Sequence, residues 1–531
     1  MFRSLFEVKI SIGIPSKDKL SYYDSELDVI DGIITNNIDI LHSILVAKLK
    51  KNSRVWREKK LQTNEMQEKY NFEKLKIFDA GNYRAKSWAK WYDVIMRFKC
   101  VFLRHYFDVS YQEMPKIIRN HIWVRLFLWL TNEKDKIPWK SILQVRESEF
   151  DEDFLYKVNE KILLPVAKKS KIVEGKKVRW DSTVIEEYIT YPTEAKLLNK
   201  WVAMVTHMAN KVKSFFGACI QKVVEQLEVT TRDMKLALLD TVKYMQKRTD
   251  ESKLAYKKTY EKMIALAKTC TEKSLTLADT LEKELEKDIR KSISSNMKQK
   301  EIKISDRERK ITTKYIVKIR STCKKIDRVV NQTERRVINW ESVPMLEKLL
   351  SYCSETVAII QKWKEWKPIE FGRKLMITEA ENRFIIQRNI PPGNPNDITL
   401  LESSFIEAVR ILWKPPKEAW YDRWFRDKET VDRLTETYKT KFGIPKRWRK
   451  TPEEEVYQKE EWFIEIQKWR AWWEAEMNCL KRDCWLWNVL VRWDKSMKTY
   501  IWWWIITNNL MVIAKKTRTR NKHKKCSSWT S

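Results

Sequence analysis

Tryptophan outnumbers glycine by 26 to 8 in this chain of 531 residues. Glycine makes up about 7% of an average protein, which is roughly 37 residues at this length. Turns with positive φ favour glycine because a Cβ atom clashes in that conformation. Tryptophans occupy turn-like positions near Pro, Asp, Arg and Lys at Trp413, Trp420, Trp424, Trp448, Trp485, Trp487 and Trp493. A tryptophan-rich aromatic core is one explanation. The other, which we favour, is a UGA codon that the host reads as glycine and the standard code writes as tryptophan.

The net charge of the chain is +33, from 105 Lys and Arg against 72 Asp and Glu. Such an excess attracts polyanions whatever their sequence, and nucleic acid is the first candidate. A membrane surface is the second, but no amphipathic anchor stands out, and the apolar run at 500–506 is too short to span a bilayer. The stretch 515–525 holds seven Lys and Arg. It predicts either a flexible arm that contacts phosphates or a solvated, disordered end.

The cysteines and histidines argue against a zinc site. Eight cysteines form no CxxC pair, and only five histidines are present. Scattered cysteines indicate a reducing, cytoplasmic compartment. Charged residues interrupt the apolar start of the chain, which therefore does not resemble a signal peptide.

Sequence patterns predict a helical beginning and a long helical insertion. Residues 1–85 form a divergent helical segment, and apolar periodicity predicts helices across 86–170, a domain that we expect to bind DNA. Residues with β propensity predict a strand over 177–189. Between 194 and 343 there is no proline and one glycine, Gly217, which predicts several long amphipathic helices.

Strands return after Pro344. The predicted elements are a hairpin over 370–377 and 383–387, a turn at 391–397, a helix over 399–412, a short strand into Tyr421 and Asp422, and a helix over 427–441. Strands that alternate with helices on both sides of a long insertion indicate an α/β core.

Three carboxylates stand where chemistry is expected. Asp181 lies inside the first strand, where a charge is costly unless it is paired or binds metal. Asp422 follows a strand, and ligands meet open α/β sheets at strand ends. Glu474 shares a predicted helix face with Arg470, four residues before it, and Lys481, seven residues after it. Each acid alone also has an ordinary interpretation: Asp181 as a strand-end cap, Asp422 as a turn residue, and Glu474 as the salt-bridge partner of Arg470.

Five short motifs occur in a fixed order along the chain. They read Asp-Ser-Thr-Val-Ile at 181–185, Ile-Thr-Tyr-Pro-Thr at 189–193, Glu-Phe-Gly-Arg-Lys at 370–374, Asp-Arg-Trp-Phe at 422–425, and the spaced set Arg470, Glu474 and Lys481. In this order they resemble the motifs of the DDE insertion-sequence transposases. The resemblance covers about residues 87–515 and includes the long helical insertion between the first and second acids.

The chain departs from the family pattern mostly where the family has glycine. Trp424 replaces the glycine after Asp-Arg, and Trp485 and Trp487 stand in what would be a Gly-Leu-Gly stretch. Trp493 replaces the glycine of an Arg/Lys-Gly pair, and Gln467 stands where the helix motif has tyrosine. The repeated exchange of glycine for tryptophan is the main support for the reassigned codon.

The resemblance implies an α/β fold: a ribonuclease-H-like mixed sheet flanked by helices, with an all-α N-terminal region and a long helical insertion. The catalytic domain would comprise residues 171–200 and 344–514, with the insertion at 201–343 and a basic tail at 515–531.

The resemblance also implies a chemistry. Asp181, Asp422 and Glu474 would bind two Mg²⁺ ions, for which Mn²⁺ would substitute, and Arg470 and Lys481 would hold the DNA backbone. The reaction would be strand cleavage and strand transfer on double-stranded DNA, at the element ends and at a target. We expect a homodimer or larger assembly on DNA, in the bacterial cytoplasm near the nucleoid, with no membrane partner. The alternative is a catalytically inactive, transposase-derived protein that binds DNA.

Overall fold

The chain forms two compact units in a computed structural model. The first comprises Met1–Ile185, Lys374–Pro391 and Pro395–Ser531, and the second comprises Glu186–Arg373 and Pro392–Asn394. The structure describes residues 25–45, 47–48, 94–130, 135–147, 149–186, 193–245, 249–294, 305–344, 347–352, 357–361, 369–446, 451–469 and 494–527.

A mixed sheet and surrounding helices give the chain an α/β architecture. The sheet order is β2-β3-β1-β5-β6, and β4 also pairs with β3. The strands are β1 (Lys177–Glu186), β2 (Ala358–Gln361), β3 (Ile369–Glu379), β4 (Ile385–Asn389), β5 (Glu418–Trp420) and β6 (Lys441–Gly443). β3 runs antiparallel to β2 and β4, whereas β1, β5 and β6 are parallel neighbours.

The predicted elements after residue 369 are present with shifted ends. The expected hairpin is formed by β3 and β4, which pair antiparallel with an irregularity between Thr378 and Glu379. The helix expected over 399–412 consists of η9 (Asp397–Leu400) and α14 (Leu401–Leu412). The helix expected over 427–441 is α15 (Lys428–Tyr438), which ends earlier because Lys439 turns into the left-handed region at φ 54°.

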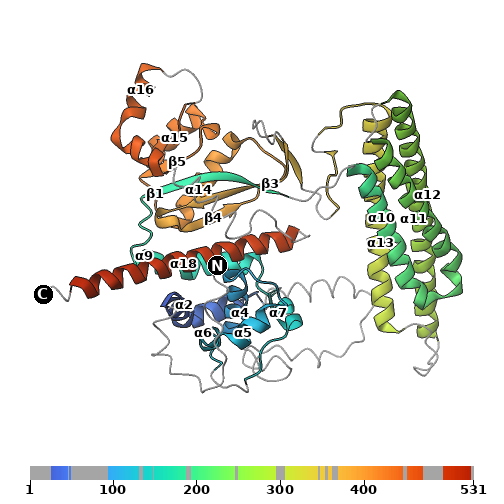
Figure 1. The fold of residues 1–531 in the computed structure, drawn as a ribbon, viewed down its shortest axis with the longest axis horizontal. Coiled ribbons are helices and arrows are strands. Elements are labelled where there is room, and N and C mark those ends of the chain that lie inside the picture. The colour runs from blue at the N-terminus through green and yellow to red at the C-terminus, as the bar shows by residue number, and fades with distance from the viewer. Residues whose placement is uncertain are drawn as a thin grey trace. The chain divides into compact units, whose positions relative to one another are not determined.

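Helices build the remainder of the first unit. They are α2 (Ser25–Asn36), α4 (Val94–Tyr106), α5 (Met114–Asn120), α6 (Ile122–Phe127), α7 (Lys140–Glu147), α8 (Glu152–Val158), η4 (Asn159–Leu163), α9 (Leu164–Lys169), η8 (Glu381–Arg383), η10 (Arg423–Phe425), α16 (Pro452–Lys459) and α18 (Asp494–Ser527). α18 lies between the sheet and the N-terminal helices and contacts α2, α4, α8 and β4 (Figure 1). One hydrophobic core therefore joins the N-terminal helices to the sheet.

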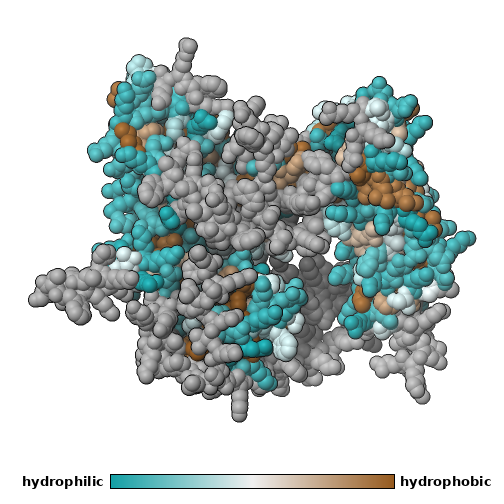
Figure 2. Space-filling view, viewed as in Figure 1, coloured by the Kyte–Doolittle hydropathy of each residue, from teal (hydrophilic) through white to brown (hydrophobic). Residues whose placement is uncertain are grey.

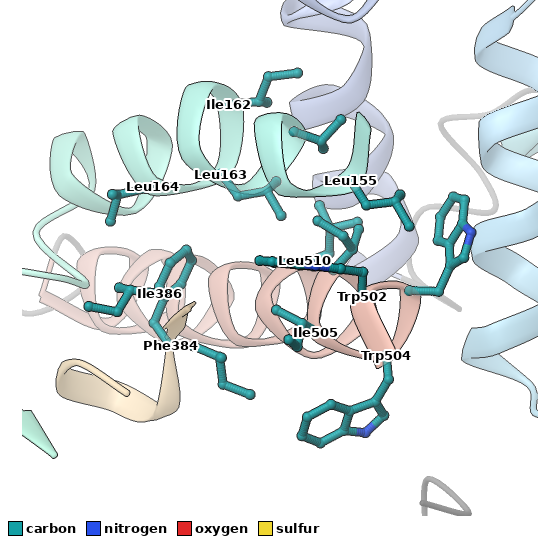
Figure 3. Packing of buried hydrophobic residues seen from close by; sticks show 14 of the residues in the cluster. Leu155, Ile162, Leu163, Leu164, Phe384, Ile386, Trp502, Trp504, Ile505 and Leu510 are labelled. Carbon is teal, nitrogen blue, oxygen red and sulfur yellow. The ribbon is translucent and has the colours of Figure 1, made fainter. Parts of the chain in front are cut away.

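The centre of this core lies around α18. Leu155 and Leu163 project from α8 and η4 toward α18, while Phe384 and Ile386 approach it from the β3–β4 hairpin (Figure 3). Asn509 of α18 adds a polar link, because its amide donates to the carbonyl of Ile385 at 2.7 Å and accepts from the N–H of the same residue at 2.9 Å. The Asn509 side chain thus satisfies both backbone groups of Ile385, the first residue of β4.

The second unit is built mainly from long helices. They are α10 (Thr193–Phe216), α11 (Ala218–Met245), α12 (Asp250–Ser294), α13 (Asp306–Thr333) and η6 (Glu334–Ile338). Their buried faces form a second hydrophobic core. Inside it, the carboxylate of Glu194 accepts from Gln332 at 3.1 Å and from Arg336 at 2.8 Å, so a buried charge is paired.

Hydrophilic residues cover much of the coloured surface in Figure 2. Within the described ranges, no helix combines the length and the apolar character that crossing a bilayer requires.

Three tryptophans occupy the left-handed region of the backbone. Trp129, Trp340 and Trp413 have φ values of 60°, 58° and 64°. The other non-glycine residues with positive φ in the described chain are polar: Asp108, Lys171, Asn382, Arg383 and Lys439. A bulky apolar side chain is unusual in this region, where glycine carries no Cβ penalty.

Each of these tryptophans follows a helix. Trp129 comes after α6, and its N–H donates to the carbonyl of Leu126 at 2.9 Å while the next N–H, of Leu130, donates to Arg125 at 2.8 Å. This pair of bonds is the Schellman motif, whose left-handed residue is usually glycine. Trp340 follows η6, and Trp413 is the left-handed cap of α14. The Trp413 side chain is 86% exposed and that of Trp340 80%, so neither supports a core.

Other tryptophans do not fit the turn prediction. Trp420 is a buried residue of β5 rather than a turn residue, so that prediction is wrong. Trp424 lies in η10 and does not have positive φ. Trp448, Trp485, Trp487 and Trp493 lie outside the described residues.

The basic end of the chain is helical as far as it is described. α18 continues without interruption through residue 527, where we expected a flexible or disordered arm. No glycine or proline occurs in this stretch to stop the helix. Arg518 lies 3.7 Å from the carboxylate of Glu26, and Arg520 donates to the carbonyls of Ser170 and Lys171. Contacts with other parts of the first unit therefore anchor the beginning of the basic stretch.

Candidate active site

The first candidate acid lies on a strand whose pairing is well defined. β1 pairs in parallel with β5, and the register places Lys177 opposite Glu418, Val178 opposite Ala419, and Arg179 opposite Trp420. The residues next along the chain continue this register. Trp180 and Tyr421 stack with ring centroids 4.3 Å apart and an interplanar angle of 5°. The two strands therefore remain in step as they approach the candidate acids.

Extending the same register by one more step would set Asp181 opposite Asp422, which lies two residues after the end of β5. Adjacent strands lie about 4.8 Å apart, and successive side chains point to opposite faces. The backbone of Asp422 is extended, with φ −68° and ψ 156°. Because Trp180 and Tyr421 stack on one face, continued alternation would put Asp181 and Asp422 on the other face. The structure thus pairs the strand that holds Asp181 with the strand that precedes Asp422, although β1 and β5 are far apart along the chain (Figure 1).

Both carboxylates make similar local hydrogen bonds. Asp181 Oδ1 accepts from the N–H of Ser182 at 2.7 Å, and Asp422 Oδ1 accepts from the N–H of Arg423 at 2.7 Å. Asp422 therefore caps η10, which agrees with its ordinary interpretation as a turn residue. A capping carboxylate can still bind a ligand through its other oxygen. These N–H groups orient both carboxylates. Both residues are half-buried, so solvent still reaches them.

The third acid and the two basic residues cannot be placed. Glu474, Arg470 and Lys481 lie outside the described residues. The helix at 461–469 runs to the last described residue before them. Within the described part of the chain, no group of three or more His, Cys, Asp or Glu is arranged to hold a metal ion.

The two placed carboxylates fit the ligand preference of magnesium. Mg²⁺ in enzymes that act on phosphates is commonly held by one or two carboxylates, with water and substrate oxygens completing its shell. Asp181 on β1 and Asp422, two residues after β5, supply two carboxylates from a pair of neighbouring strands in the middle of the sheet.

A buried arginine next to the candidate acids was not predicted. Arg179 donates to Glu379 at 2.5 Å and to the carbonyl of Trp469 at 2.7 Å. The signal was present in the sequence, because a charged residue beside Val178 and Trp180 in a strand needs a partner if it is buried.

Two further contacts hold the strands that carry the site. The carboxylate of Glu381, in the β3–β4 hairpin, accepts from the N–H groups of Lys176 and Lys177 at 2.6 and 2.8 Å, and from that of Gly175 at 3.1 Å. This carboxylate fixes the beginning of β1. Lys374 of the Glu-Phe-Gly-Arg-Lys motif donates to Asp397 at 2.8 Å and to the carbonyl of Pro395 at 2.6 Å. That lysine therefore ties β3 to the proline-rich turn.

Comparison of the chain with protein-family models, with curated proteins and with solved structures finds no match.

Proposed function

We propose that this chain is a DNA transposase of the DDE type, with a ribonuclease-H-like catalytic core. The observation that carries the proposal is the parallel pairing of β1, which holds Asp181, with β5, which Asp422 follows, together with the stack of Trp180 on Tyr421 one residue before each acid. The mixed sheet and its flanking helices agree with the architecture expected from the sequence motifs. The order of the motifs and the net charge of +33 add independent support.

The proposed reaction is phosphoryl transfer on DNA, which depends on positioning and charge neutralisation. Asp181 and Asp422, joined by Glu474, would hold Mg²⁺. When bound, the metal ions would activate the attacking oxygen and stabilise the leaving oxygen. The backbone N–H groups of Ser182 and Arg423 orient the two carboxylates. Arg470 and Lys481 would contact DNA phosphates, which position the duplex without reading its sequence.

The basic end of α18 would add to the surface that contacts DNA. It carries Lys515, Lys516, Arg518, Arg520, Lys522, Lys524 and Lys525. Because the backbone is helical here, the exposed Lys515 and Lys516 would contact phosphates from a helix rather than from a loose arm. Such contacts supply affinity that depends on salt and not on sequence.

A catalytically inactive DNA-binding protein is the second candidate. The left-handed tryptophans favour it, because a chain that truly carries Trp129, Trp340 and Trp413 bears backbone strain of about 1 kcal/mol or more at each site. If the host inserts glycine at these codons, that strain is absent and the first candidate is favoured.

Cleavage of the element's own ends separates the two candidates. The substrate is a duplex that carries the DNA flanking the gene, and the protein is tested as written and with glycine at the three left-handed tryptophans. An active transposase nicks the duplex at the element ends only when Mg²⁺ or Mn²⁺ is present. A protein that binds this duplex but leaves it intact with either ion is the inactive form.

A further inference from the structure

Arg179 is a buried charge close to the candidate acids. It lies two residues before Asp181 on β1, so the two side chains share a face of the strand. Only 2% of Arg179 is exposed. Burying a guanidinium is costly unless charge and hydrogen bonds compensate for the lost water.

Contacts from two other elements surround this guanidinium. Nη2 donates to Oε1 of Glu379 at 2.5 Å, and that glutamate is itself 1% exposed. Nη1 donates to the carbonyl oxygen of Trp469 at 2.7 Å, and Cζ lies 4.5 Å from the centroid of the Trp469 ring. Arg179 therefore joins β1 to the end of β3 and to the end of the helix at 461–469.

The geometry of this junction requires arginine. A planar guanidinium presents several donors in a fixed fork and stacks on aromatic rings, whereas lysine offers a single, strongly hydrated ammonium. Glu379 adjoins an irregularity in the β3–β4 pairing, and bulges of this kind often redirect a side chain near a functional site.

We propose that Arg179 is a positioning residue that fixes the end of the helix at 461–469 against the strand carrying Asp181. Trp469 precedes Glu474 by five residues in the sequence. Arg179 thus sets the point from which the chain continues to the third acid. This inference rests on the proposed function, since it takes Glu474 as that acid.

The test replaces the ion pair without leaving a lone buried charge. Breaking a buried pair by removing one partner is strongly destabilising, whereas exchanging both partners for apolar residues is often neutral. The double variant Arg179→Met with Glu379→Leu therefore keeps the fold but loses the link to Trp469. Arg179→Lys keeps the charge opposite Glu379 and loses the second arm of the fork. Arg433→Met with Glu402→Leu is the matched control, because it removes an exposed pair of the same chemistry with a 2.7 Å contact.

Two readouts are made on each whole chain. The first is hydrogen exchange of peptides covering 461–482, which needs no activity. The second is the Mg²⁺ concentration that gives half-maximal DNA cleavage, with DNA affinity measured alongside.

We expect exchange at the end of the helix at 461–469 to become about tenfold faster in both Arg179 variants, as loss of a charge-assisted hydrogen bond implies. The half-maximal Mg²⁺ concentration should rise by about the same factor while DNA affinity stays unchanged. The control should match the wild type in both readouts. If Arg179→Lys and the double variant both exchange hydrogen at the wild-type rate at the end of this helix, the inference is overturned. If the wild type does not cleave DNA, the proposed function fails, and the exchange measurement still decides the role of Arg179.

Discussion

Replacing Trp413 or Trp340 by glycine should stabilise the unit that contains it. Both residues hold positive φ just after a helix, where the Cβ atom is strained, and both side chains are largely exposed. The substitution therefore removes strain without emptying a core. Trp413 belongs to the first unit and Trp340 to the second, so the two sites test the argument independently.

The size of the effect follows from two opposing terms. Left-handed backbone costs about 1–2 kcal/mol in a residue with a Cβ atom. Glycine offsets about 0.5–1 kcal/mol of this gain, because it loses more conformational freedom on folding than a residue with a side chain. The net gain is about 0.5–1 kcal/mol per site. In a unit of the size that holds Trp340, each kcal/mol raises the melting temperature by about 2–4 °C.

Calorimetry of the whole chain measures these shifts, and two controls isolate their cause. Trp413→Ala retains the Cβ atom, so it should bring no comparable gain. Trp139→Gly removes a tryptophan that is 75% exposed but lacks positive φ, so it should leave stability unchanged or lower it. If Trp413→Ala stabilises as much as Trp413→Gly, strain at the Cβ atom is not the reason. The gene offers a parallel check, because UGG codons at both sites would contradict the reassignment to glycine.

Three further outcomes are expected. Affinity for non-specific duplex, measured by fluorescence anisotropy, should fall about 10³-fold or more between about 50 and 200 mM salt. Deleting residues 515–531 should reduce that salt dependence without abolishing specific binding. An affinity that does not change with salt would contradict the phosphate contacts. Glu381→Ala should lower the free energy of unfolding by about 1.5–3 kcal/mol, because the carboxylate accepts from several N–H groups at the start of β1. A denaturant titration measures this change, and the exposed Glu436→Ala is the control. Burial lowers the pKa of His105, although the carboxylate of Glu147 lies 3.3 Å from its ring. The unfolded chain therefore takes up a proton at this site more readily than the folded chain, and stability should fall as the pH drops below about 6.5. His105→Gln should flatten that part of the plot of stability against pH.

Local patterns were enough to predict the hairpin and the helices after it. Strongly β-prone residues and the proline-rich turn at 391–397 specify these elements without distant partners. The charge of residues 515–525 predicts a flexible arm, but the stretch contains no glycine or proline to end a helix, and α18 continues through it. The sequence does not predict the left-handed backbone of Trp129 and Trp340, because the residue that usually marks such a helix end is glycine.

The candidate site needed tertiary information. Asp181 and Asp422 are each predicted from their place at a strand, but only the structure shows that β1 and β5 are neighbouring strands. That register depends on packing such as the stack of Trp180 on Tyr421. The contact between Arg179 and Trp469 likewise joins segments that are distant in sequence, so no local pattern predicts it.

Strand cleavage by variants of the acids tests the central claim most directly. Asp181→Ala, Asp422→Ala and Glu474→Ala are compared with the wild type on a duplex carrying the element's ends, with Mg²⁺ and at equal DNA occupancy. The exposed Asp432→Ala on α15 is the matched control. We predict that each of the three variants binds DNA normally but no longer cleaves it, while the control cleaves at the wild-type rate. Wild-type cleavage by both Asp181→Ala and Asp422→Ala would contradict the proposal that these two carboxylates form the catalytic site.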